Sequence, residues 1–506
     1  MVQLALSVLG LRRVTRFGLA LAAATAIGGC ALTTPPDHDA IVRGVLPKTT
    51  AIPPAWQAQA ANAAVADDWL KSFNDPTLQA LVAEAITNNR DLAQAAERVR
   101  IAQQAVIVVG AQLLPQVGAV LGARTTHDED HDGNFDTTLA YAGVAWELDV
   151  WGRLRAQRAA AEAGASATAL DYAYARQSLA ATVAKAWYLA SEARQQLALA
   201  ERAVGVYAEL LDLVKTRRAA GKDSDLDVVN VSAYLDSARA QVEVAREAYG
   251  EARRALEVLL GRYPAAEVEA AAAFPALPPS VAAGVPASLL ERRPDLAAAE
   301  QQVLAAFRRQ ESAKLALLPD LSISLVGGRL GDQVLSTLRL NPWLVSAAIG
   351  VSIPIYEGGA LQAKVEIATA RQAQAVAAYG VSALVAFREV ENALANERLL
   401  AKRLPFEEGA LASRTEAVRI ARIQYVAGRR DLLWVSNLQT GQIATQADVI
   451  RVRGLQRANR IQLHLALGGS FDAAPGPADL GEGRLMPRGR NSDLRFASEA
   501  SNRVDP

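Results

Sequence analysis

The sequence predicts an α+β membrane protein in which one structural unit is built twice. Three observations support this fold class. Sequence landmarks recur in the same order 204 to 207 residues apart, each copy contains two short stretches of alternating hydrophobicity, and each copy holds one very long helical stretch. Each unit therefore reads helix, two strands, very long helix, tight turn, helix, which gives four membrane strands and a set of long helices per chain.

The repeat is visible in five landmarks that keep their order. They are Asp91-Leu92 with Asp295-Leu296, Leu114-Pro115 with Leu318-Pro319, Val183-x-x-Ala186 with Val390-x-x-Ala393, Ala220-Gly221 with Ala427-Gly428, and Leu260-Gly261 with Leu467-Gly468. We therefore expect a first unit at residues 67–263, a linker at 264–287 and a second unit at 288–469.

Residues 1–29 have the pattern of a secretion signal, because basic residues precede a short apolar stretch from Phe17 to Ile27. The stretch ends at Cys30, the only cysteine of the chain, in a segment that resembles a bacterial lipobox. This position predicts lipidation of Cys30, and the alternative is a chance cysteine after an ordinary signal peptide. Ala31 after it suggests the outer membrane, and residues 30–66 are expected to form a lipid anchor and an irregular tether.

The first unit is expected to open with two helices in series. The first begins after Asn74-Asp75-Pro76, and the second stops at Pro115. In the second unit, Ser288-x-x-Glu291 predicts a capping box at the helix start, and the helix stops at Pro319. The tail at 470–506 is rich in Gly, Pro, Asp and Arg and is expected to be disordered.

Two strands are expected after each of these prolines, at residues 117–126 and 137–150 in the first unit and at 321–329 and 343–355 in the second. Apolar residues alternate there with small or polar ones. This period is typical of a membrane strand with lipid on one face and water on the other, and equally of a half-buried strand in a soluble sheet. Membrane strands need a closed barrel of about eight strands or more, so four per chain would require several copies.

Very long helices are expected at residues 153–219 and 360–426, each about 100 Å at 1.5 Å per residue. Pro405 lies inside the second stretch, where we expect a kink or a break. The neighbouring helices, at about 77–113 and 224–262, are half as long, so that two short helices match one long helix. Helices of this length need neighbours along their whole extent, as in a coiled coil.

Three segments carry a resemblance to a known family. They are Trp146-Glu147-Leu148-Asp149-Val150-Trp151-Gly152-Arg153, Arg293-Pro294-Asp295-Leu296 and Pro354-Ile355-Tyr356-Glu357-Gly358-Gly359. These segments resemble the TolC-like outer membrane factors, and with Cys30 the chain resembles the lipoprotein outer membrane components of tripartite RND-type efflux pumps. The resemblance implies a homotrimer with a 12-stranded β-barrel in the outer membrane and a 12-helix α-barrel across the periplasm. It also implies two partners, a periplasmic adaptor and an inner-membrane RND-type transporter.

Two turns, Ala220-Gly221 and Ala427-Gly428, are expected to close helical hairpins at the far ends of the long helices. Glycine suits such a turn because it adopts the left-handed conformation that ends a helix. The resemblance implies that these tips meet the adaptor and hold the gate of the tube.

The gate of this chain departs from the pattern of the family. Family members commonly place an aspartate nine residues after the second hairpin glycine, and Asn437 stands there in this chain. We predict that hydrogen bonds or salt links of Arg430, Asp431 and Asp227 restrain the closed state, while Trp434 supplies steric closure. Such a gate should respond little to divalent cations.

The segment from Asp128 to Asp136 opens like a calcium loop. It has Leu139 where such a loop needs a bidentate glutamate, so calcium binding and an ordinary solvated loop both stay open. The four histidines are scattered and no nucleophile–base pair stands out, so the sequence predicts no catalysis, no cofactor and no metal site.

Lys+Arg and Asp+Glu are balanced at 53 each, which argues against nucleic acid as a partner. The predicted function is therefore that of an exit duct, which conducts drugs or other small molecules passively from an inner-membrane pump across the periplasm and the outer membrane. Two alternatives remain, the same duct in type I secretion, and a periplasmic lipoprotein scaffold of coiled helices without a pore.

Overall fold

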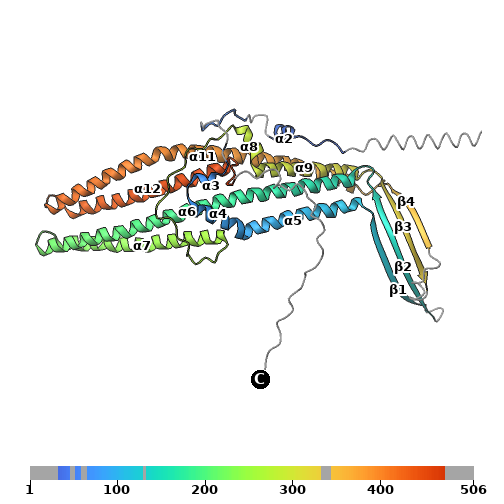
Figure 1. Cartoon of the computed structure of the whole chain (residues 1–506), viewed down its shortest axis with the longest axis horizontal. Helices are drawn as coiled ribbons and strands as arrows, with labels where there is room; N and C mark the ends of the chain where they lie inside the picture. Colours follow the sequence, from blue (N-terminus) through green and yellow to red (C-terminus); the bar gives the residue numbers. More distant parts are fainter. Residues whose placement is uncertain are drawn as a thin grey trace, which may run out of the picture.

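The computed structural model describes residues 32–45, 52–58, 65, 67–128, 133–331 and 344–472. One end of the molecule is a four-stranded sheet, and the rest is an elongated bundle of helices that run lengthwise away from it (Figure 1). Among the described helices, none is both long enough and apolar enough to cross a membrane.

The expected repeat is confirmed, since each unit has helices, two strands, a long helix and a final helix. The first unit holds α3 (Trp69–Ser72), α4 (Pro76–Asn88), α5 (Arg90–Gly110), η1 (Ala111–Leu113), β1 (Gln116–Asp128), β2 (Gly133–Leu148), α6 (Arg153–Ala219) and α7 (Asp225–Leu260). The second holds η2 (Pro286–Ser288), α8 (Leu289–Arg292), α9 (Pro294–Leu315), β3 (Asp320–Gly331), β4 (Leu344–Ser352), α11 (Ala360–Val426) and α12 (Leu432–Ala466). A short helix, α2 (His38–Val45), precedes both units.

The four strands form one antiparallel sheet in the order β1-β2-β3-β4. Each strand pairs with the next in the chain, so that Gly143 in β2 lies opposite Gly118 in β1 and Val326 in β3. In the described part of the chain, β1 and β4 each have one edge without a partner strand.

The strands and helices follow the same order across the molecule. β2 leads into α6 and β4 into α11, while α5 leads into β1 and α9 into β3. Near the sheet, α6 packs between α5 and α9, and α9 packs against α11. Toward the tips, α6 packs between α7 and α12, and α12 packs against α11. Each chain therefore forms four parallel columns, in which two are single long helices and two are pairs of shorter ones.

Both long helices have 67 residues, as expected. Of the kink or break expected at Pro405, the break is absent, because α11 runs as one helix through this residue. Proline removes a single N–H donor from the helix. Pro405 lies on the exposed face, where its ring meets solvent rather than a neighbouring helix, and the intact turns on both sides carry the helix past it.

The capping box expected at Ser288-x-x-Glu291 is also absent. Ser288 is already helical, with φ −67° and ψ −15°, and its hydroxyl donates to the carbonyl of Val285 at 2.8 Å. The long helix of this segment begins instead at Pro294, whose fixed φ and missing N–H suit the first helical position. The short helix α8 uses the Ser288 segment for a separate turn.

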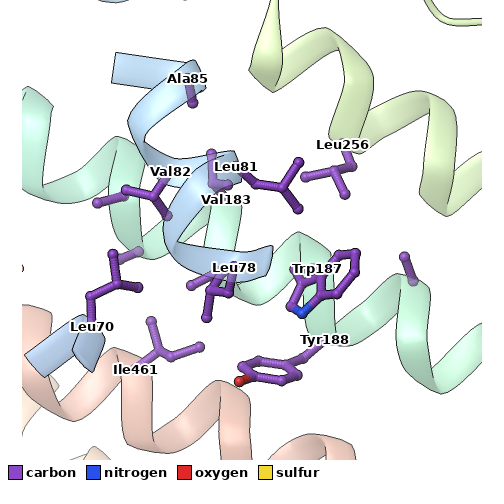
Figure 2. Packing of buried hydrophobic residues seen from close by; sticks show 14 of the residues in the cluster. Leu70, Leu78, Leu81, Val82, Ala85, Val183, Trp187, Tyr188, Leu256 and Ile461 are labelled. Atoms are coloured by element: carbon purple, nitrogen blue, oxygen red, sulfur yellow. The ribbon is translucent and has the colours of Figure 1, made fainter. Parts of the chain in front are cut away.

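The largest buried cluster lies near the middle of the bundle, where the two units meet. Its aromatic centre combines Trp69, Phe73, Trp187 and Tyr188 with Ile461 of α12. Figure 2 shows α4 packed over α6 here, with Leu78, Val82 and Leu81 pointing toward Val183, Trp187 and Leu256. We call this region the equatorial core; it also includes a second cluster that joins α8, α11 and α12.

Candidate functional site at the hairpin tips

The two expected turns close hairpins at the end of the bundle that lies farthest from the sheet (Figure 1). Gly221 and Gly428 both adopt φ +71°, the left-handed conformation. After each glycine, the next amide reaches back five residues, from Lys222 to the carbonyl of Arg217 and from Arg429 to that of Gln424. This pattern is the Schellman motif, which satisfies the last carbonyls of a helix.

A partly buried ionic cluster joins the two tips. Arg217 of the first hairpin pairs with Asp223 at 3.1 Å and donates to the carbonyl of Val426 in the second hairpin at 3.1 Å. Tyr425 of the second hairpin donates its hydroxyl to Asp223, and its ring lies 4.5 Å from the Arg217 guanidinium carbon. We call Arg217, Asp223, Tyr425 and Val426 the tip latch.

The surroundings of Arg217 and Tyr425 in the tip latch favour the protonated forms of both side chains. The hydrogen bond with Asp223 raises the pKa of Arg217. Burial raises the pKa of the Tyr425 phenol, and the hydrogen bond to Asp223 raises it further. Both groups therefore keep their protons at neutral pH and act as donors to one carboxylate, so Asp223 is the acceptor that connects the hairpins.

The predicted gate residues take other roles within one chain. Asp227 and Ser224 form a capping box at the start of α7, and Asp431 caps α12 by accepting from the amide of Trp434 at 2.9 Å. The Arg430 guanidinium lies over the Trp434 ring, 5.0 Å from its centroid. Asn437 is exposed on α12 one turn farther on. Their role in a gate remains a prediction.

Sequence reasoning missed the tip latch. Its residues surround the turn glycines, with Arg217 four before Gly221, Asp223 two after it, and Tyr425 three before Gly428. This proximity was a signal for a contact within each hairpin. The contact between hairpins depends on which helix faces become neighbours, and the repeat alone does not fix this.

An apolar cluster adjoins the tip latch on the side of the helical bundle. It contains Tyr207, Leu210 and Val214 of α6, Val231 of α7, and Leu432 of α12 with its neighbours. A cavity of about 330 Å³ follows between α6, α7 and α12, where Tyr207 stacks on Tyr234 and bonds to Thr440 at 2.9 Å. This cavity therefore interrupts the packing between the hairpins.

The start of the described chain is held close to the sheet. Glu311 accepts hydrogen bonds of 2.6 Å from both the amide and the hydroxyl of Thr33, and Arg308 donates to the Thr33 carbonyl at 2.8 Å. The side chain of Leu32 lies beside Gly152, at the junction of β2 and α6. Cys30 lies outside the described residues, but the second residue after it sits at the base of the sheet.

The motif Arg293-Pro294-Asp295-Leu296 contributes a buried arginine to a network of ion pairs and hydrogen bonds between the units. The Arg293 guanidinium bonds to Asp295 at 2.8 Å and to Glu389 of α11 at 2.6 Å, and it contacts Tyr174 of α6. Burial alone would lower the pKa of Arg293, but these carboxylates raise it. The motif therefore holds α6, α9 and α11 together.

The candidate calcium loop, from Asp128 to Asp136, falls mostly outside the described residues or has side chains that are not described. Among the residues that the structure does describe, no group of three or more metal-ligating side chains comes together. Calcium binding by the loop therefore remains as open as it was from the sequence.

Comparison with known families decides the class of the protein. The sequence model of the family described as outer membrane efflux protein matches residues 81–262 and 285–469. This chain belongs to that family. It is therefore a transport protein without enzymatic activity, the outer membrane channel of a tripartite efflux system, which joins a channel to an adaptor and an inner-membrane pump.

Relatives and solved structures agree with this assignment. The pyoverdine export outer membrane protein OpmQ of Pseudomonas putida is 30% identical over 462 residues, which cover 88% of this chain and 95% of OpmQ. The cation efflux system protein CusC of Escherichia coli is 27% identical, with 80% and 88% covered. The Campylobacter jejuni CmeC outer membrane channel superposes with a TM-score of 0.81 at 17% identity, over 89% of this chain and 97% of that one. The efflux protein described here thus has the fold of these channels.

Proposed function

We propose that three copies of this efflux protein form a lipid-anchored exit duct. The observation that carries the proposal is the four-column arrangement with two open edges. One edge consists of β1, α5 and α7, and the other of β4 and α11. Three chains joined edge to edge would give 12 strands and 12 helical columns, in a ring without free strand edges.

Exposed apolar side chains along both edges support this joining. On the first edge, Val117 and Leu121 of β1 and Ile107 of α5 are at least 60% exposed. On the second, Ile349 of β4 and Leu399 of α11 are exposed to a similar extent. Burial of the helical residues Ile107 and Leu399 against a neighbouring chain would stabilise a complex by about 25 cal/mol per Å². In the sheet, the apolar side chains would face lipid, and pairing of the backbone groups at the open strand edges favours association.

The position of the N-terminal segment supports a lipid anchor. Thr33 is fixed by Glu311, and Leu32 lies at the base of the sheet. Acyl chains on Cys30 would then enter the membrane leaflet beside the barrel, on its periplasmic side. The anchor and the barrel would thus be held at one level.

The tips would carry both the gate and the adaptor contact. Ala220, Gly221, Ala427 and Gly428 are exposed at the end of the hairpins. Removal of the tip latch would allow the hairpins to separate. We assign the inner-membrane partner to the RND type and the cargo to drugs or other small molecules, since relatives include a toluene efflux pump outer membrane protein.

The duct is tested on the full-length protein purified in detergent. Light scattering should give the mass of three chains, and planar bilayers should show discrete conductance steps. A monomer without steps would contradict the proposal and favour a scaffold without a pore. Mass spectrometry should find the lipid on Cys30, and Cys30→Ala should lose it while still forming the trimer.

The type of partner needs a separate experiment. Affinity purification after cross-linking in cells should recover an RND-type transporter with its adaptor. Recovery of an ATP-driven type I secretion transporter instead would leave the duct in place and overturn only the assignment of the pump.

A further inference from the structure

The hairpin tips carry more positive than negative charge. Residues 214–231 and 425–437 contain six basic and four acidic side chains, a net charge of +2 in each chain. Two helices end and two begin at this level, so their dipoles largely cancel. The side chains therefore determine the sign of the potential at the tips.

All four carboxylates are already engaged. Asp223 belongs to the tip latch, and Asp225 pairs with Arg218 at 2.6 Å. Asp227 and Asp431 bind the amides at the starts of α7 and α12. Each acid is thus held by a partner of its own tip.

Four cations remain without such a partner; Lys215 lies back along α6, and the other three, Lys222, Arg429 and Arg430, follow the turn glycines directly. Within the described part of the chain, no carboxylate lies at ion-pair distance from Lys222, Arg429 or Arg430, and all three are exposed. The contact of Arg430 with Trp434 positions the guanidinium but leaves its charge uncancelled. Its N–H groups stay available to carboxylate or phosphate oxygens, which guanidinium binds in a bidentate manner.

We propose that the tips form a basic ring that makes the duct selective for anions and binds anionic solutes at its entrance. The inference rests on the proposed function, because the ring exists only in the assembled tube. Three copies would place nine of these cations around one opening. Their potential extends over about one Debye length, roughly 10 Å at 0.1 M salt, so it would act on ions that enter the tube beside the tips.

The experiment measures the reversal potential of the full-length channel in planar bilayers under a KCl gradient. The wild type should be more permeable to chloride than to potassium, and the preference should weaken as salt rises. The double variant Arg429→Gln/Arg430→Gln should lose the preference or reverse it. Arg429→Lys/Arg430→Lys should keep it, which separates a charge effect from a folding defect.

A matched control is Glu416→Gln/Arg419→Gln on α11. These two residues form an exposed pair at 2.6 Å, so their joint replacement leaves the net charge unchanged and should leave the permeability ratio close to that of the wild type. Inorganic phosphate serves as a polyvalent probe, and it should block the wild type more strongly than the Gln variant.

Other outcomes overturn the inference in distinguishable ways. A cation-selective or unselective wild-type channel would contradict the basic ring and leave the duct intact. Unchanged selectivity in the Gln variant, together with a larger open probability, would show that neighbouring chains neutralise Arg429 and Arg430 through salt links. An absence of conductance steps would overturn the proposed function and this inference together.

Discussion

The equatorial core and the hairpin tips are both places where the two units of one chain meet, but they are joined by different means. At the equator, several segments interlock around large aromatic side chains and the buried guanidinium of Arg293. At the tips, a smaller cluster and the single carboxylate of Asp223 connect two hairpins. The difference predicts that the tips separate more easily than the equator.

The linker strengthens the equator further. Arg460 of α12, almost fully buried, donates to the carbonyls of Pro278 and Pro279 and pairs with Glu397 of α11. Arg457 donates to the carbonyl of Pro275 and lies over the ring of Phe274. The linker therefore fastens the two units at one level, and movement of the long helices is expected to pivot there.

The largest effect should come from Arg293→Met at the equator. This change leaves Asp295 and Glu389 without their buried partner, which costs about 3–5 kcal/mol. Thermal unfolding followed by circular dichroism should show a clear fall in Tm. Arg292→Met is the control, because its pair with Asp67 is partly exposed and contributes at most about 1 kcal/mol. An equal fall in Tm for the two variants would contradict the expectation that the buried ion pairs of Arg293 stabilise the equator more than an exposed pair does.

Acid should weaken the equator through His464. This residue stacks on Trp69, with ring centroids 5.6 Å apart, and burial, with a smaller effect of Arg460, lowers the pKa of its imidazole to about 4. The unfolded chain binds this proton more readily than the folded chain. The contribution of His464 to the free energy of unfolding is therefore fully present above about pH 6.5, and it is lost between pH 6.5 and 4, by up to about 3 kcal/mol. If His464 causes this slope, the free energy of unfolding should fall with pH more steeply in the wild type than in His464→Gln. Equal slopes in the two proteins would assign the loss to other groups.

Breaking the tip latch should affect the tips and spare the equator. Asp223→Asn weakens hydrogen bonds to a charged arginine and to Tyr425, a loss of about 1.5–3 kcal/mol between the hairpins. The open probability in planar bilayers should rise, while the main thermal transition stays unchanged. Asp225→Asn is the matched control, since its pair with Arg218 is exposed. A rise in both variants would assign the effect to charge rather than to the latch.

The smallest effect is expected at the turn glycines. Gly428→Ala places a side chain at φ +71°, where an added Cβ meets no atom within 4 Å, so only backbone strain of about 1 kcal/mol opposes it. Gly205→Ala inside α6 also meets no atom, and it should instead stabilise the helix by about 1 kcal/mol. Limited proteolysis should be faster than in the wild type for Gly428→Ala and slower for Gly205→Ala. This result would show that the left-handed backbone conformation at the turn determines the effect.

Much of the fold could be predicted because its signals are local. The bounds of α6 follow from the absence of proline and from nearby glycines, and they agree with the structure. The strand β4 is found where its alternation predicts it, but it ends at Ser352 and all nine of its residues are exposed in one chain, so the roles of its two faces stay a prediction. The break expected at Pro405 and the capping box expected at Ser288 are absent. At both residues the surrounding helix or turn outweighs the local preference of the single side chain. The glycine conformation at Gly221 was equally local and is confirmed.

The contacts across the units could not be predicted in this way. Asp223 meets Tyr425 across 202 residues of sequence, and Thr33 meets Glu311 across 278. Such pairs depend on which faces of the long helices become neighbours. A repeat with a nearly fixed offset determines the order of the elements, but it does not determine the rotation of one hairpin against the other.

The duplication has a consequence for any binding protein at the far end of the tube. The first tip presents Lys222 and Asp225, whereas the second presents Arg429 and Arg430. A rotationally symmetric assembly of three chains would therefore offer two kinds of landing point in alternation. If one copy of an identical binding protein occupied every tip, neighbouring copies could not have equivalent environments. The same protein would have to recognise two dissimilar surfaces.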